Sequence, residues 1–277
     1  NSVVNSVPAS VIPIIADGSS LVNYYGAVAY FADYEGKLWK LNLSDKGTLY
    51  DIQQLFDAES TETNGRRVMK DIVASIDTDN TLWIYYGTGD QLQLQKESTS
   101  IANRLYGLKD TDFPNYNASA SAFTVAQCRD VTSKSANCPT DTEKGWYINL
   151  DSNEKTTGKA AVSNRTVYFP RYIPNKNNPC NPGSASLSSH DYKCGNVLQN
   201  VSLGAGVASE AIIYKGKIYL GLSGTTSSGT GSGTGSGTTT LPAGWVKTDN
   251  LIVGTPPPGR VTGGVNTIRI ESWRHVY

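Results

Sequence analysis

Four segments of the chain repeat one pattern: a strand of small residues, a short polar turn, and a strand rich in aromatic residues. They span residues 27–43, 71–87, 158–172 and 208–224. Each predicts a β-hairpin, because two apolar strands that flank an Asn, Asp or Gly turn are the usual signal of one. A hairpin cannot bury both faces by itself. The repeat therefore predicts several sheets that pack on one another.

Two architectures stack hairpins in this way. A β-propeller packs blade-like sheets around an axis and leaves only short edges. A β-sandwich uses similar strands, but it does not predict an aromatic signature that recurs along the chain. We therefore expect an all-β fold, a β-propeller of quinoprotein-like blades, in a single domain over residues 1–277. Four hairpins leave two alternatives for the ring: further blades lie upstream in a longer parent, or strands without a recognisable pattern complete it.

Long polar stretches separate the hairpins, at residues 57–66, 112–144, 173–205 and 223–240. The last is a Gly/Ser/Thr tract, which predicts a flexible exposed loop because it has no side chains able to form a core. A final strand is expected at 265–277. With 27 Gly and 16 Tyr against one Met, the composition favours turns and strands over long helices.

Charge and hydropathy exclude two classes of partner. The 24 Lys and Arg balance the 24 Asp and Glu, so no overall positive field attracts a nucleic-acid backbone. No stretch approaches the roughly 20 apolar residues of a membrane-spanning helix. We expect a protein that binds no nucleic acid and does not span a membrane.

The four cysteines fall in two near pairs. Their spacing predicts disulfides Cys128–Cys138 and Cys180–Cys194, each clamping a long surface loop, in a protein exported to an oxidising compartment. Free thiols are the alternative. Neither pair has the CxxC spacing or the histidine neighbours of a zinc site.

No catalytic constellation is evident. His190 and His275 are the two histidines of the sequence, and no GxSxG, HExxH or P-loop motif occurs. A quinoprotein dehydrogenase would also contain tryptophan-rich hairpins, and four tryptophans are placed to fit one: Trp39, Trp83, Trp146 and Trp273. Packing between blades explains such tryptophans better. We therefore predict no catalytic and no cofactor-binding residue.

Several phrases occur in an order that resembles a known family. They are YFADYEGKLWKLNL, then WIYYGTGD followed by RLYGLKD, then GWYINL at 145–150, and IESWRHVY at the end. In this order they resemble the C-terminal β-propeller of the PilY family, over about residues 8–277. Members are type IV pilus biogenesis factors and tip adhesins. The resemblance implies that the chain is the C-terminal part of a larger protein, without its N-terminal region.

The resemblance also implies a function and a location. We expect a non-enzymatic module of pilus assembly and tip adhesion, which contacts minor pilins or the pilin filament, the N-terminal part of the same protein, and a surface or host ligand. It would lie outside the bacterial cell, associated with the pilus, after export through the periplasm. Two alternatives remain: a remnant of a quinoprotein-like dehydrogenase, and a passive structural subunit of an extracellular filament.

Some PilY members carry a calcium site on a DxDxDG-type loop. The nearest match here is Asp77, Asp79 and Asn80, which lacks the glycine and the distal bidentate acid of such a loop. Residues 16–19 offer a single carboxylate. Asp77, Asp79 and Asn80 are thus calcium candidates, with ordinary turn residues as the alternative.

Overall fold

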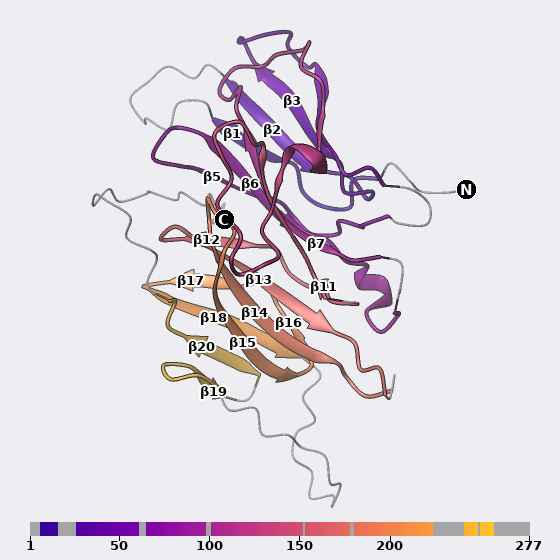
Figure 1. Cartoon of the computed structure of the whole chain (residues 1–277), viewed down its shortest axis with the longest axis vertical. Coiled ribbons are helices and arrows are strands. Elements are labelled where there is room, and N and C mark those ends of the chain that lie inside the picture. Colours follow the sequence, from indigo (N-terminus) through magenta and orange to yellow (C-terminus); the bar gives the residue numbers. More distant parts are fainter. Residues whose placement is uncertain are drawn as a thin grey trace, which may run out of the picture.

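The computed structural model describes residues 6–15, 26–60, 65–97, 101–151, 153–177, 180–223, 241–248 and 250–257 (Figure 1). This part of the chain is nearly all β, with two single-turn 3-10 helices, η1 (Gln91–Gln93) and η2 (Val125–Gln127). The expected all-β fold is confirmed. The Gly/Ser/Thr tract from residue 224 onward, the expected strand at 265–277 and the loop at 16–19 lie outside the described residues.

The strands form four sheets that follow one another along the chain. In spatial order, sheet 1 contains β1 (Ile12–Ile15), β2 (Gly26–Ala32), β3 (Leu38–Ser44), β4 (Ile52–Asp57) and β8 (Phe123–Thr124). Sheet 2 contains β5 (Val73–Ile76), β6 (Leu82–Gly87), β7 (Arg104–Asp110), β10 (Gly145–Asn149) and β9 (Arg129–Asp130). Neighbours are antiparallel, except that β8 runs parallel to β4 and β9 parallel to β10.

The other two sheets lack an added parallel strand. Sheet 3 contains β11 (Lys155–Thr156) and β12 (Ala161–Ser163), which both pair with β13 (Thr166–Ile173), followed by β14 (Ser184–Asp191) and β15 (Val197–Ala205). Sheet 4 contains β16 (Val207–Ala208) and β17 (Ile212–Tyr214), which both pair with β18 (Lys217–Ser223), followed by β20 (Leu251–Gly254) and β19 (Val246–Thr248).

Each sheet packs face to face on the next one in the sequence (Figure 1). Tyr30 and Leu38 of sheet 1 meet Tyr86 and Tyr106 of sheet 2 in one core. A second core joins sheets 2 and 3 through residues that include Trp146, Tyr85, Val167 and Phe169. A third joins sheets 3 and 4 through Leu187, Val201, Leu220 and Ile252, among others. Three successive interfaces of this kind are what consecutive propeller blades form.

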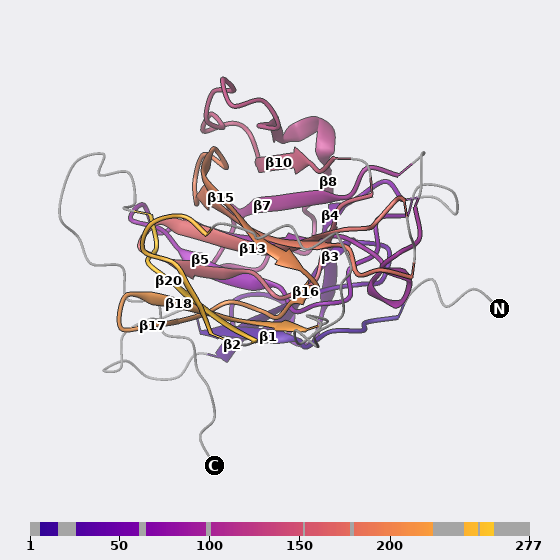
Figure 2. The same ribbon diagram turned by 90° about the horizontal axis from the view of Figure 1, so that it is seen from below.

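One strand of sheet 3, β12, lies beside a strand of each neighbouring sheet, since it contacts both β5 of sheet 2 and β17 of sheet 4. Figure 2 shows the stack along a perpendicular direction. The sheets therefore share an inner edge. The other edges of sheets 1 and 2 are covered by β8 and β9.

The four repeated hairpins are confirmed as β2–β3, β5–β6, β12–β13 and β17–β18. The long polar stretch at 173–205, in which a surface loop closed by Cys180–Cys194 was expected, instead consists mostly of β14 and β15. Strand β14 is rich in serine, and the pairing of β14 with β15 contains two irregularities. Their pattern is therefore weak.

Residues 111–144 leave sheet 2 after β7 and cross to sheet 1, where β8 pairs with β4. They then return through η2 to sheet 2, where β9 pairs with β10. We call this segment the strap. It covers the outer edges of two sheets with one continuous stretch of chain.

Candidate functional site

The predicted calcium candidates lie in the tight turn between β5 and β6. Asp77 is buried, and its Oδ1 accepts hydrogen bonds from the backbone N–H groups of Asp79 (2.8 Å) and Thr81 (3.0 Å). Its Oδ2 accepts the indole N–H of Trp83 at 2.9 Å. The carboxylate thus holds the turn closed and fixes the tryptophan that follows it.

The turn between β2 and β3 has the same wiring. Asp33 is also buried, and its Oδ1 accepts the backbone N–H groups of Glu35 and Lys37, both at 3.0 Å. Its Oδ2 accepts the indole N–H of Trp39 at 2.9 Å. In both turns the aspartate precedes the tryptophan by six residues. An Asp–Trp turn is therefore a structural unit that the chain uses twice.

A lysine distinguishes the two turns. Lys193 Nζ lies 3.0 Å from Asp77 Oδ2 and also contacts the carboxylate of Asp79. Burial raises the pKa of Asp33 above its ordinary value, despite the hydrogen bonds from Trp39 and the turn backbone. Burial acts on Asp77 in the same direction, but hydrogen bonds from Trp83, Thr81 and Lys193 outweigh it and lower its pKa. The ammonium group of Lys193 is thus a partner that Asp77 has and Asp33 lacks, and the pKa values of the two carboxylates shift in opposite directions.

This geometry bears on the calcium interpretation. Both Asp77 oxygens already accept hydrogen bonds, and the ammonium of Lys193 bridges Asp77 and Asp79 where a cation would sit. Asn80 adopts a left-handed backbone conformation (φ 61°), as a turn residue does. The described residues contain no group of three or more His, Cys, Asp or Glu side chains placed to hold a metal ion. Calcium binding at this turn stays a prediction.

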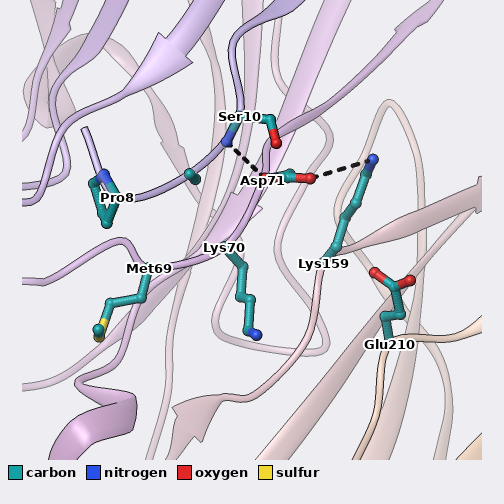
Figure 3. A pocket seen from close by; sticks show the side chains of 8 residues that line it. Pro8, Ser10, Met69, Lys70, Asp71, Lys159 and Glu210 are labelled. Atoms are coloured by element: carbon teal, nitrogen blue, oxygen red, sulfur yellow. Dashed lines mark hydrogen bonds and ion pairs between the residues drawn. The ribbon is translucent and has the colours of Figure 1, made fainter.

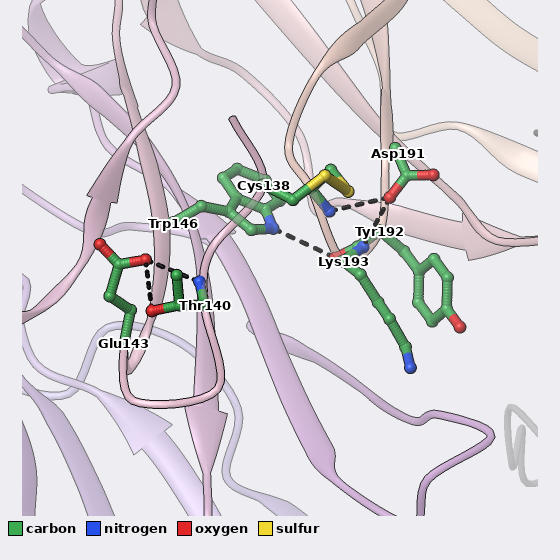
Figure 4. Close-up of a disulfide and its surroundings, with 8 residues drawn as sticks. Cys138, Thr140, Glu143, Trp146, Asp191, Tyr192 and Lys193 are labelled. Atoms are coloured by element: carbon green, nitrogen blue, oxygen red, sulfur yellow. Dashed lines mark hydrogen bonds between the residues drawn. A yellow bond between two sulfur atoms is a disulfide. The ribbon is translucent and has the colours of Figure 1, made fainter. Parts of the chain in front are cut away.

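The disulfide pairing differs from the one expected. Cys138 of the strap is bonded to Cys194, in the turn that joins β14 and β15 (Figure 4). Cys128 is buried, and its thiol contacts the Thr124 carbonyl oxygen at 3.7 Å. The predicted pairs Cys128–Cys138 and Cys180–Cys194 are therefore wrong. The bond that forms joins sheet 2 to sheet 3 rather than closing a local loop.

The unrecognised strand β14 explains the error. Cys180 precedes β14 and Cys194 follows it, so the two residues lie at opposite ends of an eight-residue strand. Such a strand is roughly 26 Å long, whereas the Cα atoms of a disulfide lie within about 7 Å. Cys180 and Cys194 are therefore close in the sequence but far apart in space.

The hairpin turn that carries Cys194 is anchored by several further contacts. The carbonyl oxygen of Tyr192 accepts hydrogen bonds from the Tyr85 hydroxyl and from the Trp146 indole N–H, both at 3.1 Å. Asp191 Oδ1 accepts the backbone N–H groups of Lys193 and Cys194 (Figure 4). The turn between β14 and β15 is thereby fixed to sheet 2 by covalent, polar and ionic contacts.

His190 lies in the core between sheets 2 and 3, close to the rings of Trp146 and Phe169. Its Nδ1 lies 2.9 Å from the carbonyl oxygen of Gly195, to which the neutral ring donates. Burial lowers the pKa of His190 to about 4. The histidine is thus a neutral core residue at physiological pH. Its ring contacts give His190 a role in packing between the two sheets.

The tryptophans considered as a quinoprotein signature have structural partners. Trp39 and Trp83 donate to the turn aspartates, and Trp146 donates to Tyr192. An added Cβ on Gly107 would lie 2.3 Å from the Trp146 ring, so glycine is required where this indole packs on β7. Trp273 and His275 lie outside the described residues.

A pocket of about 400 Å³ lies where the innermost strands of all four sheets begin (Figure 3). We call it the axial pocket, lined by Pro8–Ser10, Met69–Asp71, Lys159 and Glu210. Asp71 Oδ1 accepts the backbone N–H of Ser10 at 2.8 Å, and Asp71 Oδ2 lies 3.9 Å from Lys159 Nζ. Sheets 1, 2 and 3 are thereby joined across its wall.

Sequence reasoning missed the axial pocket. Part of a signal was present, because Asp71, Lys159 and Glu210 stand two positions before the repeated hairpins that begin with β5, β12 and β17. Aligning these repeats by their strand starts would have matched the three residues. Ser10 stands two positions before β1, which is not part of a repeated hairpin, so the alignment would not have included it. Across the described ranges, no helix is long and apolar enough to cross a membrane.

Comparison with known proteins gives two informative matches. The chain is 24% identical over 194 residues to a type IV pilus biogenesis factor PilY1 homolog from Xylella fastidiosa; the match covers 61% of this chain but 13% of that protein. Its fold is similar to the crystal structure of the Pseudomonas aeruginosa PilY1 C-terminal domain, with a TM-score of 0.54 at 15% identity, covering 77% of this chain and 58% of that one. No family model matches the chain. The resemblance to the PilY1 C-terminal domain is therefore confirmed.

Proposed function

We propose that this chain is the C-terminal β-propeller region of a PilY-type protein, and that it acts as a non-enzymatic module of type IV pilus assembly and tip adhesion. The observation that carries the proposal is that the sequence match and the fold match, found separately, both point to PilY1 proteins. The module would work at the bacterial surface, where it contacts minor pilins or the pilin filament and a surface or host ligand through its polar loops.

The ends of the stack support the proposal that the chain is one part of a larger protein. On sheet 4, Ile212, Tyr219, Val253 and Val246 form one cross-strand row. Strand residues alternate between faces, so this row lies opposite the face that buries Ile218, Leu220 and Ile252 against sheet 3. Val246 is 62% exposed.

Sheet 1 has a partly exposed face at the other end of the stack. Pro13, Ala29, Leu41 and Ile52 form a cross-strand row, in which Ile52 is 51% exposed and Ala29 is buried. We propose that further blade-like sheets from the remainder of the parent protein pack on both faces. Such packing would repeat the face-to-face contacts of the three interfaces between sheets 1 and 4.

The face on sheet 4 can be tested by substitution. Val246→Arg places a charge on the open face, whereas Lys247→Met changes the next residue of β19, which faces the other way. We expect limited proteolysis of the full-length protein to release the C-terminal region from Val246→Arg but not from Lys247→Met. Equal resistance of both variants would contradict packing of a further sheet on this face.

The pilus role can be tested by deleting these 277 residues from the chromosomal gene and counting surface pili and twitching cells. We expect fewer pili and reduced twitching, both restored by the intact gene. A deletion strain with normal pili would argue for a passive structural subunit instead. Co-purification of the intact protein with a minor pilin, lost on deletion of the module, tests the proposed partner directly.

A further inference from the structure

The axial pocket lies where one strand from each of the four sheets begins. Ser10, Asp71, Lys159 and Glu210 each stand two residues before such a strand (β1, β5, β12 and β17), and the fold brings them to one place. Pockets formed where several repeated elements converge are a common location of binding sites. The pocket also combines residues that are up to 200 positions apart in the sequence (Ser10 to Glu210).

Close contacts between neighbouring sheets hold the pocket in shape. Asp71 links sheet 2 to sheet 1 through the backbone N–H of Ser10, and to sheet 3 through Lys159. An added Cβ on Gly158 would lie 2.8 Å from the Glu210 backbone, so only glycine allows sheets 3 and 4 to approach this closely. The wall is thus formed before any ligand arrives, which lowers the ordering cost of binding.

Two lysines of the pocket lining have weak ion pairs or none among the described residues. Lys70 is exposed and makes no hydrogen bond or ion pair with any residue that the structure describes. Lys159 is 35% exposed and has its carboxylate partner at the outer limit of an ion pair, 3.9 Å away. The Asp71 carboxylate is already engaged by Ser10. Two ammonium groups can therefore contact an incoming anion, and Glu210 is the second carboxylate of the same lining.

We propose that the axial pocket binds a carboxylate of a partner polypeptide, held by the ammonium groups of Lys70 and Lys159. The volume of about 400 Å³ is at the small end of ligand-sized pockets and suits a short peptide segment. The carboxylate can come from an acidic side chain or from a chain terminus. This inference rests on the residues of the pocket, and it does not require the partner to be a pilin.

Three acetylated tripeptides serve as probes of the purified 277-residue protein. The first has a central aspartate and an amidated end, the second is triglycine with a free carboxyl end, and the third has a central asparagine and an amidated end. Titration is followed by the backbone amide resonances of residues 69–71 and 159. We expect at least one carboxylate peptide to shift these resonances and the asparagine peptide to leave them unchanged.

Two substitutions change the charge of the pocket in opposite directions. Lys70→Met should weaken carboxylate binding about two- to fivefold, as loss of one partly screened ion pair predicts. Asp71→Asn should strengthen it, because the amide oxygen can still accept from Ser10 while the competing negative charge is gone. Lys134→Met, which removes an exposed lysine of the strap, is the matched control and should have no effect.

Binding of the aspartate peptide alone identifies a side-chain carboxylate, binding of the free-acid peptide alone identifies a chain terminus, and either supports the proposal. Binding of the asparagine peptide with equal strength, the same affinity in Lys70→Met as in wild type, or no binding of either acidic peptide at millimolar concentration would overturn it. The readout uses no pili. A negative titration therefore does not count against the pilus assignment, which the deletion experiment tests separately.

Discussion

His190 should make the protein sensitive to mild acid. The ring is 2% exposed, and burial holds its pKa at about 4, against an ordinary histidine pKa of about 6.5. Below pH 6.5 the unfolded chain gains a proton at this position that the folded protein does not accept. The stabilising effect of the neutral ring is therefore complete above pH 6.5 and is lost progressively as the pH falls toward 4.

The size of the effect follows from the two pKa values. Linkage gives a loss of about 2 kcal/mol in unfolding free energy between pH 7.5 and pH 5.0, and about 3 kcal/mol once the pH is below 4. Carboxylates titrate in part of this range and contribute their own dependence. The comparison must therefore be between variants measured at the same pH values.

Urea unfolding of wild type and His190→Gln at pH 7.5, 6.0 and 5.0 isolates the histidine. Glutamine retains a donor for the Gly195 carbonyl oxygen but does not titrate. We expect the variant to be less stable at pH 7.5, because it packs less well beside Trp146, but to lose about 2 kcal/mol less than wild type on going to pH 5.0. Parallel pH profiles for wild type and His190→Gln would refute the argument.

Three further predictions concern the contacts between sheets. Replacing Cys138 and Cys194 by serine opens a cross-link that spans 56 residues and should lower the unfolding free energy by about 4 kcal/mol in urea denaturation; a peptide map of the unreduced protein should show this pair. Lys193→Met removes the partner of the buried Asp77 and should cost about 1–2 kcal/mol. Lys155 Nζ donates to three backbone carbonyls at and beyond the end of η1, those of Gln93, Leu94 and Lys96, at 2.6–2.7 Å. Lys155→Met should therefore cost about 3 kcal/mol and speed hydrogen exchange over residues 91–97.

Each of these has a result that would contradict it. A map with Cys128–Cys138 would restore the pairing expected from spacing. A calcium-induced rise in melting temperature that disappears in Asp77→Asn would establish the calcium site instead of the lysine contact. For Lys155, unchanged exchange over 91–97 would mean that the carbonyls are held by other contacts.

The fold was predictable from sequence wherever local alternation and turn chemistry agree. The hairpin β5–β6 is an example, because Asp77 closes its turn and Trp83 follows at a fixed distance. The same spacing recurs at Asp33 and Trp39, so one local rule is used twice. Such features need no knowledge of distant residues, and the sequence contains all of the information that specifies them.

The disulfide could not be obtained in this way. Its partners are chosen by the path of the strap, which carries Cys138 out to the β14–β15 turn, and by β14, which separates Cys180 from Cys194. Both depend on tertiary structure. The serine-rich strand β14 has a weak alternation pattern because its side chains are buried between two sheets, where no face is left to solvent.

The axial pocket shows a different limit. The positions two residues before β1, β5, β12 and β17 hold Ser10, Asp71, Lys159 and Glu210, which share no chemical type, so a search for a repeated motif passes over them. The alternation of apolar and polar residues fixes where each strand begins, but it does not restrict the type of residue that stands just before the strand. That freedom is what allows loops on a repeated scaffold to differ from blade to blade and to form a site together. In a repeat protein, the positions that the repeat brings together are therefore better indicators of a binding site than the residues that it conserves in type.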